Sequence, residues 1–330
     1  MKHVSILTLY DATLTSIDSS HQVFSRVNDF MAYQGRSPFY EVELVGLQSE
    51  MELGSGRYRI QTDKTISDIK NTDVVVVPLL CGDFGAAIGR NRGYHDWLVA
   101  QHQKGSEIVC LCVGSFFLAS TGLLDNKRCA IHWAARNEFE VRFPQVQIVD
   151  DNIITDENGV YTCGGGYSYL NLLLYVLEKH LGREIAILAS KMFEIDFERK
   201  TQNPFTIFIG QKAHGDDVVL RAQELIESNP TSSFHVDDVC NELGIGRRTF
   251  ERRFKKCTGN SVVEYVQRVK VEYAKKLLES GSKTINEVTY ATGYNDVDAF
   301  RKVFKRFTDL SPLSYRRKYQ PEVVNSGRTY

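Results

Sequence analysis

Residues 235–259 read HVDDVCNELGIGRRTFERRFKKCTG, and this stretch decides the fold of the last third of the chain. Apolar residues recur at helical spacing before and after the GIG triplet at 244–246, whose glycines allow a tight change of direction. The apolar positions are Val236, Val239 and Leu243 before the triplet, and Phe250 and Phe254 after it. Two short helices joined by a glycine turn predict a helix-turn-helix unit.

The second predicted helix leaves a strongly charged face outward. Its exposed positions are Arg247, Arg248, Glu251, Arg252 and Lys255. Arginines near a helix N-terminus oppose the macrodipole, so helix stability does not favour them there. Contacts with bases and phosphates do favour them, and the alternative is a helix face that is only solvated.

Residues 284–312, TINEVTYATGYNDVDAFRKVFKRFTDLSP, repeat this plan. Thr284 and Glu287 predict a capping box, and Asn295 is expected to cap the second helix with Asp298 at its third position. Gly293 supplies the turn. The apolar stripe of the second helix consists of Phe300, Val303, Phe304 and Phe307, and its outward positions are Asp298, Arg301, Lys302, Lys305 and Arg306.

A helix that begins at a further predicted capping box, Ser261 and Glu264, joins the two units. A rigid spacer of this kind would hold two recognition helices about 34 Å apart, which is one turn of DNA. One chain could then read two successive major grooves. The two helices are expected at 247–256 and 296–307.

The charge distribution agrees with this prediction. The 330 residues carry a net charge of −1, but 244–320 hold 18 Lys and Arg against 8 Asp and Glu, whereas 1–212 hold 20 against 25. A local basic surplus on an acidic chain is typical of a phosphate-binding module, although a charged solvated face could produce part of it.

The rest of the composition excludes several classes. No apolar run approaches the roughly 18 to 20 residues of a spanning helix, and the N-terminus has no signal-peptide cleavage pattern. Seven irregularly spaced cysteines without a CxxC pair indicate reduced thiols in a cytoplasm. We expect no metal site and no cofactor.

The first part of the chain alternates strand-like and helix-like patterns. Short β-branched runs occur at 4–9, 42–45, 74–80, 108–111, 146–149 and 160–162, and helical patterns at 22–32, 93–104, 115–121 and 167–181. This alternation predicts an α/β sandwich with a largely parallel sheet. The expected organisation is an α/β domain at 1–197, a linker at 198–217, an all-α domain at 218–320 and a fraying tail at 321–330.

A strand-turn-helix elbow is predicted within 107–124, EIVCLCVGSFFLASTGLL. The strand ends at Leu111, Cys112 occupies the turn, and Gly114 permits close packing where the helix begins. The helix dipole would lower the pKa of an exposed thiol at this position. The alternative, which the residues leave equally open, is a small cysteine buried in the sheet core.

The C-terminal residues of the chain resemble the AraC/XylS DNA-binding domain. The matching motifs are RRFK..TG at 252–259, A..LL at 274–278, E.....GY at 287–294 and SP..YRR at 311–317. The resemblance implies that bases are read by Arg248, Glu251 and Arg252 in the first unit, and by Asp298 and Lys302 in the second. We expect Arg247, Asn295 and Arg301 to add contacts with double-stranded DNA.

The segment 112–146, CVGSFFLASTGLLDNKRCAIHWAARNEFEVRFPQV, is similar to the PfpI/ThiJ, or class I glutamine amidotransferase-like, domain of GlxA-family regulators. The resemblance implies a flavodoxin-like, amidotransferase-like α/β sandwich in a cytoplasmic, nucleoid-associated homodimeric regulator. In catalytic members an acidic residue of the first helix serves the elbow cysteine. Here Gln22 stands at that position, and Asn171 stands where an Asp is common. Because an amide cannot take a proton from a thiol, we expect no enzyme.

The working hypothesis is therefore a DNA-binding transcriptional regulator whose N-terminal domain binds a small effector, such as a nitrogenous metabolite. The candidate effector-pocket residues are Gln22, Cys112, Val113, His132 and Gly165. Two alternatives stay open: a PfpI-like cysteine-dependent hydrolase or hydratase with a DNA-binding tail, and a redox sensor that acts through oxidation of Cys112.

Overall fold

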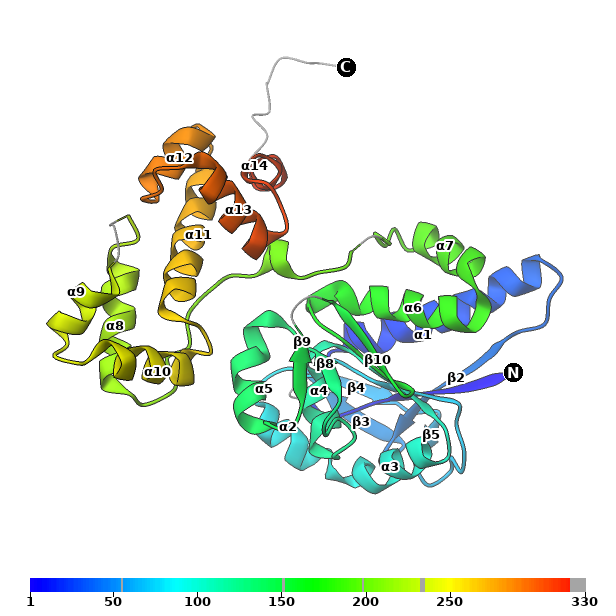
Figure 1. Ribbon diagram of the computed structural model, residues 1–330. Coiled ribbons are helices and arrows are strands. Elements are labelled where there is room, and N and C mark those ends of the chain that lie inside the picture. Colours follow the sequence, from blue (N-terminus) through cyan, green and yellow to red (C-terminus); the bar gives the residue numbers. More distant parts are fainter. Residues whose placement is uncertain (55, 150–151, 198, 232–234, 321–330) are drawn as a thin grey trace, which may run out of the picture. The chain divides into compact units, whose positions relative to one another are not determined.

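The computed structural model describes residues 1–320 except 55, 150–151, 198 and 232–234. The chain divides into two compact units, one ending at Gln202 and the other beginning at Asn203 (Figure 1). The tail predicted at 321–330 lies outside the described residues. None of the described helices combines the length and the apolar character needed to cross a membrane.

The N-terminal unit is built on a seven-stranded sheet of order β10-β11-β7-β6-β1-β2-β5. All neighbouring strands pair in parallel except β10 and β11, which are antiparallel. The strands are β1 (Lys2–Leu7), β2 (Tyr40–Gly46), β5 (Lys64–Thr65), β6 (Val74–Val77), β7 (Glu107–Cys110), β10 (Ile154–Glu157) and β11 (Val160–Cys163). The predicted α/β class with a largely parallel sheet is confirmed.

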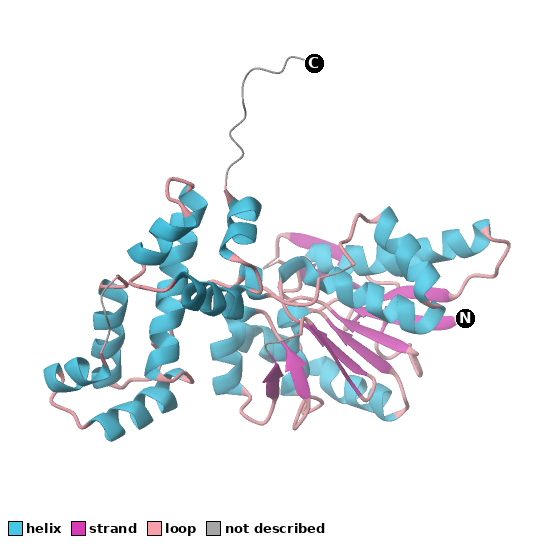
Figure 2. Ribbon diagram, turned by 45° about the horizontal axis from the view of Figure 1, so that its top comes forward, coloured by secondary structure: helices cyan, strands magenta, loops and turns pink. Residues whose placement is uncertain are grey.

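Helices cover both faces of this sheet (Figures 1 and 2). One face carries α1 (Leu14–Tyr33), α6 (Tyr169–Leu181) and α7 (Arg183–Met192), and the other carries α2 (Phe84–Arg90), α3 (His95–Gln103), α4 (Ser115–Ser120) and α5 (Arg136–Arg142). Such coverage explains why the central strand β6 consists of four fully buried valines.

The sheet prediction was wrong in one part. The run expected at 146–149 forms β9 (Gln147–Val149), which pairs with β8 (Arg128–Ala130) in a separate two-stranded sheet. A hairpin of β3 (Glu50–Leu53) and β4 (Tyr58–Gln61) was not predicted. Its strands alternate charged and apolar residues over only four positions each, which is too short for a clear periodicity.

The C-terminal unit is helical and contains an internal structural repeat. Its helices are α8 (Asp217–Ser228), α9 (Val236–Glu242), α10 (Arg247–Thr258), α11 (Val262–Ser280), α12 (Ile285–Ala291), α13 (Val297–Thr308) and α14 (Pro312–Tyr319). Two equivalent tyrosines mark the repeat: Tyr265 donates a hydrogen bond to Glu227, and Tyr315 donates one to Glu279. Each half has its own apolar cluster.

Helix capping follows the sequence in part. The box of Thr284 and Glu287 at α12 is present in both directions, as predicted. At α11 the Ser261 hydroxyl accepts from the Glu264 N–H, but Glu264 directs its carboxylate to Arg268. The predicted cap Asn295 was wrong: Asp296 caps α13, because its carboxylate accepts from the first free N–H groups of that helix.

The stretch 203–211, within the predicted linker, packs on the C-terminal unit. The Phe208 ring packs edge-on against the Tyr265 ring, and the Tyr319 hydroxyl donates to the Pro204 carbonyl. The middle of the predicted linker therefore packs as part of this unit, which begins at Asn203.

Candidate nucleic-acid interface and sensor site

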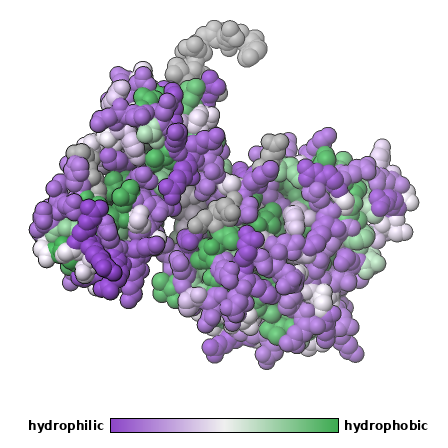
Figure 3. Space-filling view, in the orientation of Figure 1, coloured by the Kyte–Doolittle hydropathy of each residue, from purple (hydrophilic) through white to green (hydrophobic). Residues whose placement is uncertain are grey.

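The first helix-turn-helix unit consists of α9, a turn at 243–246 and α10. Gly244 has φ +62°, the left-handed conformation that a glycine adopts without strain. Phe250 and Phe254 are fully buried on the inner side of α10. The outer side therefore faces solvent, and hydrophilic side chains cover the visible face of α10 in Figure 3.

Arg247 has a structural partner that the sequence did not reveal. Its guanidinium donates to both carboxylate oxygens of Asp237 on α9, at 3.1 and 3.2 Å, and to Glu251 on α10, at 3.1 Å. These contacts hold the two helices together and offset the unfavourable position of this arginine in the helix dipole. The expectation that stability does not explain Arg247 was wrong.

Arg248 and Arg252 differ from Arg247 in having no carboxylate partner among the described residues. Both side chains are exposed on α10, and neither forms an ion pair within the described part of the chain. Glu251, by contrast, is engaged by Arg247. Among the described residues, Arg248 and Arg252 are therefore the guanidiniums of α10 that no carboxylate engages, whereas Arg247 and Arg253 are paired.

The second unit consists of α12, a turn through Gly293 and α13. Gly293 has φ +71°, and a Cβ at this position would clash with the Thr231 carbonyl oxygen, so the turn requires glycine. Along α13 the side chains of Asp298, Arg301 and Lys302 are exposed, as is Asn295 in the turn. Arg301 donates to Asp298 at 3.3 Å, which leaves Lys302 as a cation without an ion pair among the described residues.

The elbow of the α/β unit has the predicted course. Cys112 follows β7 with φ +49°, and the Leu111 N–H donates to the Val77 carbonyl at 2.9 Å. A side chain at Gly114 would collide with the Pro78 carbonyl, so the close packing expected of this glycine is confirmed.

The thiol of Cys112 is not exposed, however. It is 2% exposed, and burial raises its pKa to about 12, although the N–H groups of Val113 and Gly165 lower the pKa in part. The Cys112 N–H donates to the Cys163 sulfur at 3.2 Å. Of the two alternatives that the residues left open, the structure shows the buried cysteine, and its pKa is raised because desolvation exceeds the effect of the backbone dipoles.

Gln202, which the sequence did not single out, packs over the glycine turn next to the elbow. Its amide donates to the Ile131 carbonyl at 2.8 Å and accepts from the Trp133 N–H at 3.1 Å. A Cβ at Gly164 would overlap this amide, and one at Gly165 would touch it. The space above the turn is therefore occupied by the chain itself.

The remaining candidates are spread around this turn. Gly165 reaches the Cys112 sulfur through its N–H, whereas His132 accepts from the Ala134 N–H at 3.1 Å, and burial lowers the pKa of His132. Gln22 lies half-buried on α1. Asn171 donates to the Asp196 carbonyl at 2.6 Å, which gives this amide a structural role.

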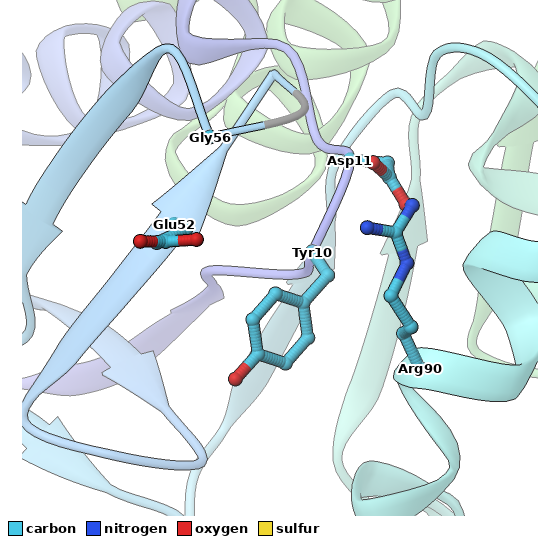
Figure 4. A pocket seen from close by; sticks show the side chains of 5 residues that line it. All are labelled: Tyr10, Asp11, Glu52, Gly56 and Arg90. Carbon is cyan, nitrogen blue, oxygen red and sulfur yellow. The ribbon is translucent and has the colours of Figure 1, made fainter.

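A cavity of about 220 Å³ opens beside the carboxyl end of β1 (Figure 4). It is lined by Tyr10, Asp11, Glu52, Gly56 and Arg90, and Arg90 forms an ion pair with the buried Asp11. These residues come from three distant segments, so only the fold brings them together. The one signal in the sequence was a carboxylate placed directly after the first buried strand.

Among the described residues, no cluster of His, Cys, Asp and Glu could hold a metal ion.

The two helix-turn-helix units and the α/β unit together define a class of regulator in which a helix-turn-helix domain is joined to an α/β domain. The chain matches the family described as "Helix-turn-helix domain" over 239–318 and the DJ-1/PfpI family over 31–179. The chain thus combines an AraC-type helix-turn-helix domain with a DJ-1/PfpI domain, as expected of a transcriptional regulator.

Curated relatives carry matching names. The chain is 25% identical to the HTH-type transcriptional regulator GbdR of Pseudomonas aeruginosa, over 95% of this chain and 84% of the relative. It is 25% identical to the HTH-type transcriptional regulator GlxA of Rhizobium meliloti, over 68% and 69%.

A solved structure shares the fold of part of the chain. A putative transcriptional regulator from Vibrio parahaemolyticus is 21% identical, with a TM-score of 0.52, over 58% of this chain and 98% of that one.

Proposed function

We propose that the α/β unit binds a small metabolite and that this binding changes the affinity of the C-terminal unit for DNA. The observation that carries the proposal is that one chain contains both kinds of unit. Its two helix-turn-helix units carry unpaired basic side chains on their outer faces, and its α/β unit has a fold that often holds ligands beyond the carboxyl ends of its strands. A metabolite can shift DNA binding only by as much as its affinity differs between the two states.

We assign base contacts in the DNA complex to the basic side chains of the two recognition helices that have no carboxylate partner. Arg248 and Arg252 on α10 would pair with guanine, and Lys302 on α13 would do the same in the next groove. Glu251 and Asp298 would accept from cytosine after exchanging their present arginine partners. Arg247, Asn295 and Arg301 complete the proposed surface.

No catalysis is assigned to the elbow. A thiol with a pKa near 12 contains almost no thiolate at neutral pH, and Gln22 cannot act as a base. The same burial disfavours a redox sensor, since peroxide oxidises exposed thiolates. The turn around Cys112, Val113, Gly165 and His132 remains a candidate for effector contact.

The proposed organisation is a sensor at 1–197, a linker at 198–217 and a DNA-binding domain at 218–320. We propose a nucleoid-associated homodimer, in which each chain presents two recognition helices. Pairing of the chains would place four helices on one operator.

The proposal is tested with the full chain. Genomic DNA that the purified protein retains is sequenced, and the fragment recovered is used in binding titrations with a panel of nitrogenous metabolites. We expect one compound to change the Kd for this fragment at least 5-fold, with no equal change for random DNA. If no compound changes the Kd, the sensor role is wrong while the DNA-binding role stands.

A further inference from the structure

The cavity at Tyr10, Asp11, Glu52, Gly56 and Arg90 lies at the topological switch point of the sheet. From β1 the chain first adds β2 on one side and later places β6 on the other side. The crevice between β1 and β6, beyond their carboxyl ends, is where open α/β sheets hold ligands. Asp11 follows β1, and Arg90 ends α2, the helix after β6.

Arg90 is held in place with part of its guanidinium unused. Its side chain is 51% exposed, whereas its partner Asp11 is 3% exposed. Figure 4 shows one nitrogen of the guanidinium at Asp11 and another directed into the cavity. Asp11 is the only polar partner of Arg90 among the described residues, so several N–H donors of the planar group stay available.

The backbone around this ion pair is fixed before any ligand arrives. Asn91, fully buried, accepts from the Tyr10 N–H at 2.9 Å and donates to the Tyr10 and Ala87 carbonyls at 2.9 and 2.8 Å. Asp11 itself has φ +64°, a conformation that residues other than glycine rarely adopt. Strained residues held by their surroundings are concentrated at ligand and active sites.

The lining limits the ligand by charge and size. A planar guanidinium with free donors favours a carboxylate, which it binds in a bidentate manner. Glu52 lies on the β3–β4 hairpin, across the cavity from Arg90, and forms an ion pair with Arg59 at 3.3 Å. Its carboxylate disfavours a ligand that carries two negative charges. A volume of about 220 Å³ is below the roughly 300 to 1,000 Å³ of sites for drug-sized molecules.

We infer that this cavity, rather than the elbow at Cys112, is the effector site, and that it binds a small monocarboxylate through Arg90. The inference rests on the sensor role proposed above and adds the place and the ligand chemistry. Gln202 occupies the space above the glycine turn next to the elbow, whereas the Arg90 cavity is open and carries an unused donor group.

The test is thermal unfolding of the full chain with monocarboxylates of two to seven carbons, with and without an amino group, and with their primary amides. We expect at least one acid to raise Tm by on the order of 3 °C at tenfold excess over its Kd, and its amide to have no effect. Arg90→Gln should weaken this binding at least 10-fold. Arg90→Lys, which keeps the ion pair with Asp11 but lacks the planar fork, should give an intermediate loss.

The matched control is Arg92→Gln, an exposed arginine two residues away that does not line the cavity. It should retain the Tm response of the unchanged protein. A response that survives in Arg90→Gln, or that is lost in Cys112→Ala instead, overturns the inference but leaves the sensor role standing. The absence of a Tm response to every acid overturns it as well. A failure of the sensor role itself would appear separately, as DNA binding that no metabolite of the nitrogenous panel changes.

Discussion

At Cys112 a left-handed backbone and a buried thiol occur together. The sequence predicts the elbow from Cys112 and Gly114, but not whether the sulfur is exposed, because exposure depends on distant residues such as Cys163. Gln202 lies far beyond the elbow strand, which ends at Cys110, and could not be assigned to the neighbouring glycine turn from any local pattern.

The first residue-scale prediction concerns the reactivity of this thiol. With a pKa of about 12, the thiolate fraction of Cys112 at pH 8 is on the order of 1,000-fold below that of an ordinary cysteine. Iodoacetamide should therefore label the half-buried Cys81 and Cys257 well before Cys112, as measured by mass spectrometry of peptides. Labelling in urea, where all three should react alike, is the control. Equal rates in the folded protein would show that the thiol is accessible and ionised.

A second prediction concerns Glu107 at the start of β7. Burial raises its pKa, but hydrogen bonds from His180 at 2.5 Å and Tyr161 at 2.8 Å outweigh burial and lower the pKa to about 2. A depressed carboxylate pKa stabilises the fold above the unfolded-state pKa near 4.5, and this stabilisation is lost as pH falls towards 2.

Glu107→Gln should therefore reduce the free energy of unfolding at pH 7 by on the order of 2 to 3 kcal/mol, and by much less at pH 2.5. Urea denaturation at the two pH values measures this difference. Glu138→Gln, on an exposed carboxylate of α5, is the control and should change little. A loss for Glu107→Gln that is independent of pH would contradict the assigned ion pairing.

At the scale of the element, local patterns were most informative in the C-terminal unit. The helix spacing, the glycine turns and the Thr284 cap depend on residues within four positions of one another, and they are present as predicted. The choice of Asp296 over Asn295 as a cap was missed, because adjacent residues of similar capping preference cannot be separated by sequence alone.

The capping box of α12 supports a prediction about stability. Thr284→Ala removes the hydroxyl that accepts from the Glu287 N–H at 3.2 Å, so we expect a loss of about 1 kcal/mol. Thermal or urea unfolding measures the loss. Ser282→Ala, two residues earlier and exposed, should stay within about 0.5 kcal/mol of the unchanged protein. Equal effects of the two substitutions would argue against the cap.

The recognition helices give a prediction about base reading. Arg252→Ala should weaken binding to the specific site by about 1 to 3 kcal/mol and relax base preference at one position. Lys305→Ala, on the outer face of α13, should weaken binding to all sequences and reduce the salt dependence by about one phosphate contact. Titrations on specific and random DNA at several salt concentrations distinguish the two. Identical losses on both DNAs for both variants would contradict the assigned roles.

At the scale of the whole molecule, the two-part organisation and the α/β class were predictable, because charge and hydrophobic period change along the chain. The sheet order, the β3–β4 hairpin and the cavity at Arg90 were not. That cavity joins residues 10–11, 52–56 and 90, and their proximity follows from the strand order rather than from any local motif.

The central claim is that each chain reads two successive major grooves through α10 and α13. The most direct measurement is selection of the full chain against a random DNA library, followed by hydroxyl-radical footprinting of the selected site. Two protected segments about 10 base pairs apart on one face of the duplex are predicted, with base preference relaxed at one position of one segment for Arg252→Ala and at one position of the other for Lys302→Ala. Recovery of no preferred sequence, or of a single segment that both substitutions affect alike, would contradict the claim.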